Sequence, residues 1–150
     1  MKLDGTYTFN APRQLVWETL QDPEALRKAI PGVESFETVG PNEYRAAMKV
    51  GVGAIKGTFT GKIRVFDQQP PSHYKLAVDA QGGPGTVHGE GAFELVEDGP
   101  DKTILNWVAD GQVGGTVAAV GQRMLGGVAK TTVGQLWKSM DEQVKARQGA

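Results

Sequence analysis

The sequence predicts an α+β fold in which a curved, antiparallel, seven-stranded sheet wraps around one long C-terminal helix. Three observations predict it. Apolar and polar residues alternate with period two through most of residues 33–112, as in strands with one buried face. Residues 116–145 contain no proline and carry apolar side chains at helical spacing. The length of 150 residues suits one domain, spanning residues 1–150.

The residues before position 33 predict one strand followed by two short helices. Weak alternation marks the strand over residues 4–9. The first helix begins near Pro12, because proline is favoured in the first turn of a helix. Asp22 and Pro23 repeat this signal as a capping carboxylate and a proline at the first helical position. The Pro-Gly dipeptide at 31–32 ends the second helix.

The region from residue 33 to about residue 112 predicts six strands. Turn-forming residues at 40–42, 70–72, 82–85 and 98–101 separate alternating runs, each with one polar face. Strands at such spacing form an antiparallel meander. The apolar face of that sheet needs a cover, and the C-terminal helix is the element long enough to provide it.

Two apolar stripes run along the predicted C-terminal helix. The first consists of Val117, Val120, Met124 and Val128, and the second of Val133, Trp137, Met140 and Val144. At 3.6 residues per turn the stripes lie on nearly opposite sides. A kink near residues 126–127, or a change of packing partner along the helix, reconciles them.

Composition and charge exclude several functions. With no cysteine, the chain has no disulfide, thiolate metal site or thiol catalysis. His73, His88 and Glu90 could be read as a metal site, but two histidines with one nearby carboxylate arise readily by chance, so we expect no metal-binding and no catalytic residues. The net charge of −1, and basic residues without interleaved aromatics, argue against nucleic acid. Without a signal peptide or an apolar run of about 20 residues, we expect a cytoplasmic protein.

Glycine is the unusual part of the composition. Of the 21 glycines, fifteen lie in three clusters, between Gly51 and Gly61, between Gly82 and Gly91, and between Gly111 and Gly127. Glycines on the inward register remove side-chain volume, so they predict a cavity between sheet and helix. The alternative, that they only allow a curved sheet to bend, stays open. The residues expected to line a ligand cavity are Phe59, Gly61, Ile63, Tyr74, Leu76, Gly89, Gly91, Phe93, Leu105, Trp107, Met124 and Val128.

Several segments resemble the carbon monoxide dehydrogenase G-subunit family. They are Asp22-Pro23, Ile30-Pro31-Gly32, the run from Ile55 to Gly61, and Pro70-Pro71-Ser72-His73-Tyr74, and the resemblance covers essentially the whole chain. It implies the helix-grip fold of the START-like (SRPBCC) superfamily, which the periodicity predicts independently. It also implies an accessory protein of an aerobic molybdenum-containing carbon monoxide dehydrogenase or related hydroxylase. Such a protein contacts the inner face of the membrane, or handles an apolar molecule such as a quinone or lipid. Many members have a cysteine where this chain has Val33, so no thiol role carries over.

Three functions are compatible with these residues. The leading hypothesis is a non-enzymatic binding protein that holds a hydrophobic small molecule, has no intrinsic cofactor, and serves a molybdenum hydroxylase. The second is an enzyme of the cyclase or hydratase kind, which needs a titratable group inside the pocket, and Tyr74 is the inward candidate. The third is a docking module with a filled core that acts through its surface.

Overall fold

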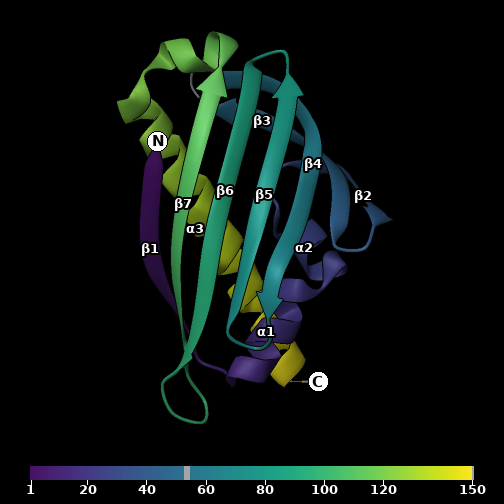
Figure 1. Ribbon diagram of the computed structural model, residues 1–150, viewed down its shortest axis with the longest axis vertical. Coiled ribbons are helices and arrows are strands. Elements are labelled where there is room, and N and C mark those ends of the chain that lie inside the picture. Colours follow the sequence, from purple (N-terminus) through teal and green to yellow (C-terminus); the bar gives the residue numbers. More distant parts are fainter. Residues whose placement is uncertain (53–54, 150) are drawn as a thin grey trace.

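The computed structural model describes residues 1–52 and 55–149 and contains a seven-stranded antiparallel sheet curved around a long helix (Figure 1). The strand order is β1-β7-β6-β5-β4-β3-β2, so each strand after β2 pairs with its predecessor and β7 returns beside β1. The predicted fold is confirmed. The strands are β1 (Lys2–Phe9), β2 (Val33–Gly40), β3 (Glu43–Val52), β4 (Ile55–Gln69), β5 (His73–Gly82), β6 (Gly85–Glu97) and β7 (Thr103–Gly114).

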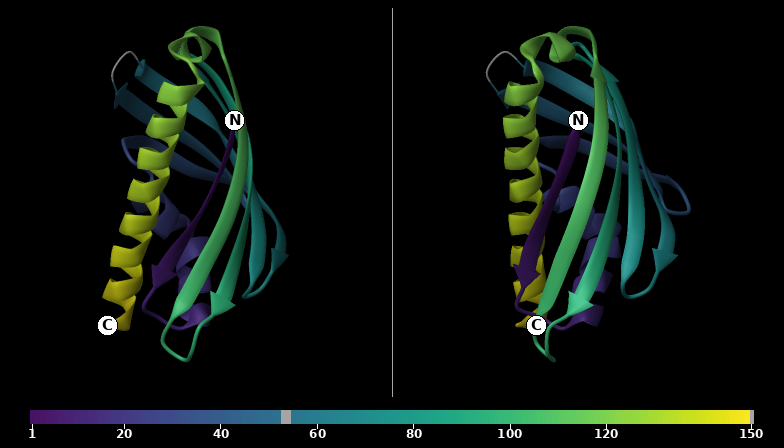
Figure 2. Two further views of the ribbon diagram at one scale, coloured as in Figure 1. Left: turned by 90° about the vertical axis from the view of Figure 1, so that its left-hand side faces the viewer. Right: turned by 60° about the vertical axis from the view of Figure 1, so that its left-hand side comes forward.

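The helices lie on the concave face of the sheet (Figure 2). The long helix α3 (Gln122–Gln148) runs along that face, while α1 (Arg13–Gln21) and α2 (Pro23–Ala29) lie near its C-terminal end. A short 3₁₀ helix, η1 (Gly115–Val120), joins β7 to α3 at the opposite end. Within the described residues, no helix combines the length and the apolar character needed to cross a membrane.

The two short helices form where the sequence places their start signals. The Asp22 carboxylate accepts a hydrogen bond from the Glu24 backbone N–H at 3.0 Å and caps α2, and Pro23 occupies its first position. At the end of α2 the chain turns through Gly32, which has φ +70°. A Cβ there would lie 2.3 Å from the Lys49 carbonyl oxygen, so this turn requires glycine.

The C-terminal helix begins later than the sequence predicts. The residues expected to open it form η1, and Gly121, with φ +93°, separates η1 from α3. From Gln122 onward α3 is continuous over 27 residues, with no break at residues 126–127. Of the first apolar stripe, Val117 and Val120 therefore lie in η1, and Met124 and Val128 lie in α3, so the predicted single helix is interrupted at Gly121 and not near residues 126–127.

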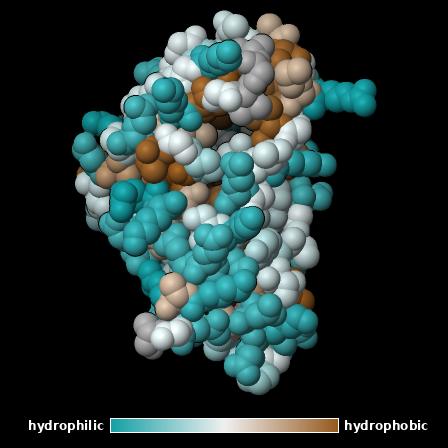
Figure 3. All heavy atoms as spheres, turned by 180° about the vertical axis from the view of Figure 1, so that it is seen from behind, coloured by the Kyte–Doolittle hydropathy of each residue, from teal (hydrophilic) through white to brown (hydrophobic). Residues whose placement is uncertain are grey.

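The core consists of two hydrophobic clusters. The main cluster fills the end of the molecule that contains α1, α2 and the second half of α3, and its members include Phe9, Leu105 and Met140. The second cluster lies at the η1 end, where Ile55, Val117 and Leu125 are buried together. Figure 3 shows hydrophobic atoms gathered at that end of the molecule, around a hollow in the surface.

Polar contacts fix the second half of α3. The Gln143 side chain donates a hydrogen bond to the Ala25 carbonyl oxygen (2.9 Å), and the Tyr7 hydroxyl donates one to Asp141 (2.9 Å). Arg147 donates to the Asp22 carboxylate that caps α2. This half of the helix is therefore tied both to α2 and to β1.

Candidate functional site

A cavity of about 300 Å³ lies between the concave face of the sheet and α3. Its volume is at the lower end of the range for small-molecule pockets, about 300–1,000 Å³. The helix side of the wall consists of Ala129, Val133, Leu136, Trp137 and Met140, with Leu20 and Leu26 from α1 and α2. The remaining wall comes from Met1 and the sheet residues Leu3, Val65, Tyr74, Leu76, Val78, Val87, Gly89, Glu90, Gly91, Phe93, Trp107, Ala109, Asp110 and Gly111.

Four aromatic rings form a continuous band in this wall. Tyr74 stacks on Phe93 with ring centroids 4.8 Å apart. Phe93 meets Trp137 edge-on at 5.8 Å, and Trp137 in turn lies 6.4 Å from Trp107. Each of these distances falls within the range of favourable aromatic pairs. The band joins β5, β6 and β7 to the middle of α3 and gives the cavity a rigid apolar surface.

The structure brings together half of the residues predicted from the sequence. Tyr74, Leu76, Gly89, Gly91, Phe93 and Trp107 line the cavity. The residues Phe59, Gly61, Ile63, Leu105, Met124 and Val128 are not part of its wall.

Most of these differences follow from the position of the two core clusters. Phe59 and Val128 pack against the second cluster, beyond the end of the cavity. Leu105 has no exposed surface and belongs to the main cluster. Met124, in contrast, is 51% exposed, so its predicted inward orientation is wrong. The cavity shares much of its wall with the main cluster, for example Tyr74 and Trp107, and on α3 the wall begins at Ala129, directly after the predicted Val128.

The three glycines predicted to face inward, Gly61, Gly89 and Gly91, have different surroundings in the structure. A Cβ on Gly89 would meet only the Asp110 carbonyl oxygen at 3.6 Å and the Gly111 Cα at 4.0 Å, which are ordinary contacts. Gly89 also lines the cavity, so a longer side chain at this position would extend into it. At Gly91 the Phe93 ring already fills the position, because a Cβ would lie 2.9 Å from its Cζ.

Gly61 has a third role. A Cβ there would lie 2.2 Å from the Asp79 carbonyl oxygen and 2.6 Å from the Ala80 Cα, on the neighbouring strand β5. This glycine permits a close approach of two backbones, so the expectation that it contributes cavity space is wrong. Gly61 is therefore a site of close backbone approach between β4 and β5, whereas Gly89 lines the cavity.

No charged side chain faces the cavity in the described part of the chain. Glu90 and Asp110 contribute to its wall, but both are exposed and alternate with inward residues, so their side chains point to the convex face. Tyr74 is almost wholly buried, and burial raises the pKa of its phenol far above the ordinary value. The hydroxyl therefore stays neutral and cannot serve as a base at physiological pH.

One polar group of the wall lacks a partner. The Trp137 side chain is 5% exposed, and its indole Nε1, itself buried, meets no hydrogen-bond acceptor among the described residues. Buried tryptophan N–H groups usually find a partner. The apolar stripe that contains Trp137 is typical of ordinary helix packing, so sequence reasoning missed this half of the wall. The helical spacing of Val133, Trp137, Met140 and Val144 was the feature of the sequence that could have identified this part of the wall.

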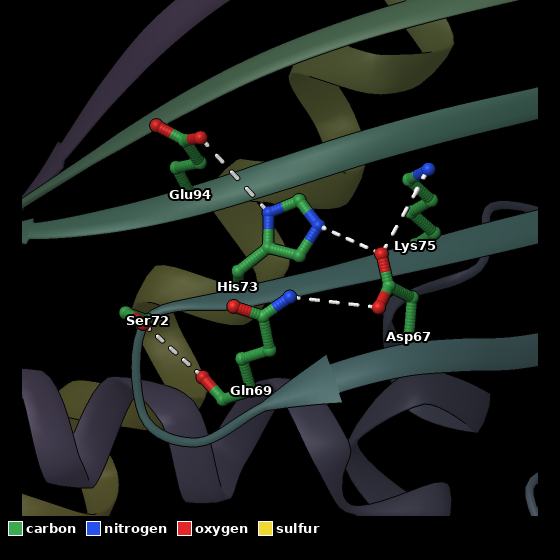
Figure 4. Close-up of polar contacts among 6 residues, drawn as sticks. All are labelled: Asp67, Gln69, Ser72, His73, Lys75 and Glu94. Carbon is green, nitrogen blue, oxygen red and sulfur yellow. Dashed lines mark hydrogen bonds and ion pairs between the residues drawn. The ribbon is translucent and has the colours of Figure 1, made fainter.

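The histidines lie on the convex face in separate pairs. His73 on β5 lies between Asp67 of β4, at 3.4 Å, and Glu94 of β6, at 4.0 Å (Figure 4). Lys75 is 3.8 Å from the same Asp67 carboxylate, which stands at a bulge with φ +50°. His88 pairs with Asp79. Among residues 1–52 and 55–149, no group of three or more His, Cys, Asp or Glu side chains has an arrangement that could hold a metal ion. These contacts are cross-strand pairing on the surface of the sheet.

Comparison with known proteins gives one family and one fold. The model of the carbon monoxide dehydrogenase G-subunit family (CoxG) matches residues 5–145. A conserved protein from Geobacillus kaustophilus is 38% identical, with a TM-score of 0.94 over 97% of this chain and 96% of that one. No curated protein sequence matches.

Two more distant structures share the fold. A START superfamily protein from Mycobacterium smegmatis is 20% identical, with a TM-score of 0.73 over 97% of both chains. The Zhui aromatase/cyclase from Streptomyces sp. R1128 is also 20% identical, with a TM-score of 0.71 over 98% of this chain and 94% of that one. At this level of identity the likeness shows the START-like fold alone.

Proposed function

Because the chain belongs to the carbon monoxide dehydrogenase G-subunit family (CoxG), we propose that it is an accessory protein whose cavity holds a hydrophobic small molecule, such as a quinone or lipid. The enzyme that it serves, in this proposal, is a molybdenum-containing carbon monoxide dehydrogenase or a related hydroxylase. The family and the START-like fold support a ligand-binding accessory role. The apolar cavity of about 300 Å³ between the sheet and α3 supports the proposal that the ligand is a hydrophobic small molecule. We place the protein in the cytoplasm, in contact with the inner face of the membrane, from which an apolar ligand can be collected.

The cavity is better suited to binding than to acid–base catalysis. General acid–base chemistry needs a titratable group held near the operating pH inside the site. Tyr74 is the ionisable side chain on the inward register of the described wall, because Glu90 and Asp110 point outward, and burial raises the pKa of its phenol away from neutrality. The likeness to the Zhui aromatase/cyclase concerns the fold, and no residue of this cavity adds a catalytic argument to it. We therefore propose no reaction for this site.

The test is direct analysis of the bound molecule. We expect native mass spectrometry of the purified protein to show an adduct, and organic extraction to release an apolar compound of one mass. Titration of extracted protein with a short-chain quinone should give saturable binding with a stoichiometry of one. Gly89→Leu, which fills the cavity, serves as the matched control and should not bind. If neither extraction nor titration of the wild-type chain detects a ligand, the proposal fails.

The partner assignment has its own measurement. We expect the chain to co-purify with the molybdenum hydroxylase of its own organism when either protein is tagged. Binding that persists in Gly89→Leu would show that the enzyme recognises the surface of the chain, as in the docking-module hypothesis. Loss of binding in that variant alone would show that recognition depends on the loaded cavity.

A further inference from the structure

Charge is divided between the two halves of the convex face of the sheet. On the half formed by β3 and β4, five exposed cations on the outward register form a basic stripe: Arg45, Lys49, Lys56, Lys62 and Arg64. On the half formed by β6 and β7, the exposed outward side chains include three acids: Glu90, Glu94 and Asp110. The strand β5 lies between the two halves (Figure 1), so the acids of β6 are about 10 Å or more from β4 across the sheet.

The basic stripe keeps its positive charge. Within the described residues, none of its five cations forms an ion pair with a carboxylate. Asp79 lies opposite Lys62 in the sheet, but it pairs with His88 on its other side. Glu37 lies opposite Arg45 on the edge strand, and no ion pair joins these two side chains. The ordinary cross-strand pairing of a sheet surface therefore does not account for the stripe.

The centre of the stripe contains an unfavourable arrangement. Arg45 on β3 and Lys62 on β4 lie directly opposite each other and on the same face of the sheet. Like charges in directly opposed positions destabilise a sheet. Natural sequences keep local conflicts of this kind mainly at functional sites. A carboxylate between the two cations, supplied from outside the chain, would remove the conflict.

The shape and lining of the surface indicate the class of partner. Arg45 and Lys62 belong to the lining of an open hollow of about 460 Å³ on the convex face. Its other exposed side chains are polar: Thr60, Asp79, Gln81, Thr86 and His88. A flat lipid surface cannot enter a hollow, and this lining has no aromatic or long aliphatic side chain for insertion into a bilayer. It also has no Phe, Tyr or Trp ring on which a nucleic-acid base could stack. A protruding segment of a protein fits both the shape and the polarity.

On the premise that the chain serves a molybdenum hydroxylase, we propose that the basic stripe is the surface on which this enzyme docks. The enzyme presents an acidic protrusion, whose Asp or Glu side chains enter the hollow and bind between Arg45 and Lys62. The guanidinium of Arg45 can hold a carboxylate through two parallel hydrogen bonds. From Lys56 to Arg64 the stripe is about 26 Å long, at about 3.3 Å per strand residue. This length is close to the width of about 28 Å that a standard interface of about 800 Å² per partner requires.

The experiment compares two variants that each lose two positive charges. Arg45→Gln/Lys62→Gln neutralises the centre of the stripe. The matched control, Lys130→Gln/Lys138→Gln, neutralises two exposed lysines of α3, on the concave side of the sheet. The affinity of each for the purified molybdenum hydroxylase of the same organism is measured by calorimetric titration at low and at high salt. At low salt we expect Arg45→Gln/Lys62→Gln to raise Kd by about threefold to thirtyfold, and the control by less than about twofold. High salt should weaken wild type more than Arg45→Gln/Lys62→Gln, because salt screens exposed charges.

The possible results separate this inference from the proposed function. If wild type does not bind the enzyme, the partner assignment and this inference are both wrong, whereas the ligand function of the cavity is decided by the quinone titration alone. If wild type binds and the two double variants bind equally well, the enzyme remains the partner and this inference is overturned. Both variants should bind the short-chain quinone as wild type does, because neither change touches the cavity wall.

Two further measurements test the reasoning behind the proposal. Arg45→Gln/Lys62→Gln removes a like-charge pair, so its Tm should equal or exceed that of wild type; a lower Tm with unchanged affinity for the enzyme would show a structural role and overturn the inference. Sedimentation with vesicles that contain about 30 mol % phosphatidylglycerol tests a lipid surface as the partner. Loss of vesicle binding in this variant, with binding to the enzyme unchanged, would also overturn it.

Discussion

Replacing Gly89 by leucine should stabilise the protein while abolishing ligand binding. A Cβ at this position meets only the Asp110 carbonyl oxygen at 3.6 Å and the Gly111 Cα at 4.0 Å, so the first atom of the new side chain fits without displacement. The remaining atoms enter the cavity of about 300 Å³ that Gly89 lines. A gain in stability here is expected both from filling this space and from replacing a strand glycine.

The magnitude follows from burial. A leucine side chain moved fully from water into the interior contributes about 1.5–3 kcal/mol. Removing a glycine from a strand adds about 0.5–1 kcal/mol, and the lost rotamer freedom of the leucine costs about 0.5–1 kcal/mol. The expected net stabilisation is therefore about 1–3 kcal/mol, equivalent to a rise in Tm of about 2–12 °C for a chain of this length. Because one leucine occupies much of a small cavity, ligand affinity should fall at least about tenfold.

Thermal and denaturant unfolding of the ligand-free protein measure the first effect, and calorimetric titration measures the second. Gly61→Ala is the control, because a Cβ there would lie 2.2 Å from the Asp79 carbonyl oxygen and should cost about 1–3 kcal/mol. The reasoning is refuted if Gly89→Leu is destabilised as Gly61→Ala is, since the space above Gly89 would then be filled. A stabilised variant that still binds ligand at wild-type affinity would place the binding site elsewhere.

Two further predictions concern the contacts that hold α3. Burial, and then the hydrogen bond to Asp141, raise the pKa of Tyr7 to about 12. Below about pH 10, Tyr7→Phe should therefore be less stable than wild type by about 1–2 kcal/mol in urea unfolding. As the pH rises from about 10 to about 12, wild type should lose this advantage in stability. Burial alone would raise the pKa of Asp22, but hydrogen bonds from Arg147 and from backbone N–H groups lower it below its ordinary value. Asp22→Asn, which keeps a capping oxygen, should lower the free energy of unfolding by less than about 1 kcal/mol at pH 7. This difference in stability between wild type and variant should vanish as the pH falls below the native pKa of Asp22. A difference that persists in acid would contradict the role of the Arg147 ion pair.

Alternation along the strands was sufficient to predict much of the sheet face of the cavity. Tyr74, Phe93 and Trp107 occupy the inward register of β5, β6 and β7, and all three line the cavity. Successive strand residues point to opposite faces, so the orientation of each of these rings depends on its position in its own strand alone.

The helix face was not predictable in the same way. The sequence has apolar residues on more than one side of the predicted helix, and only the position of the sheet decides which side faces the cavity. The structure places Trp137 and Met140 in the wall and leaves Met124 exposed, and Gly121, with φ +93°, ends η1 before α3 begins at Gln122. The positive φ of this glycine is a backbone property that composition does not reveal.

The fold could be predicted from the sequence, because the period of the apolar residues changes from two to 3.6 between the strands and the C-terminal helix. The positions of the glycines are also given in the sequence. Which glycine lines the cavity depends instead on atoms from other parts of the fold: a backbone oxygen of β5 against Gly61, the Phe93 ring over Gly91, and the cavity beside Gly89. The same reason applies to Trp137, whose unpartnered N–H results from the packing of α3 against β6 and β7.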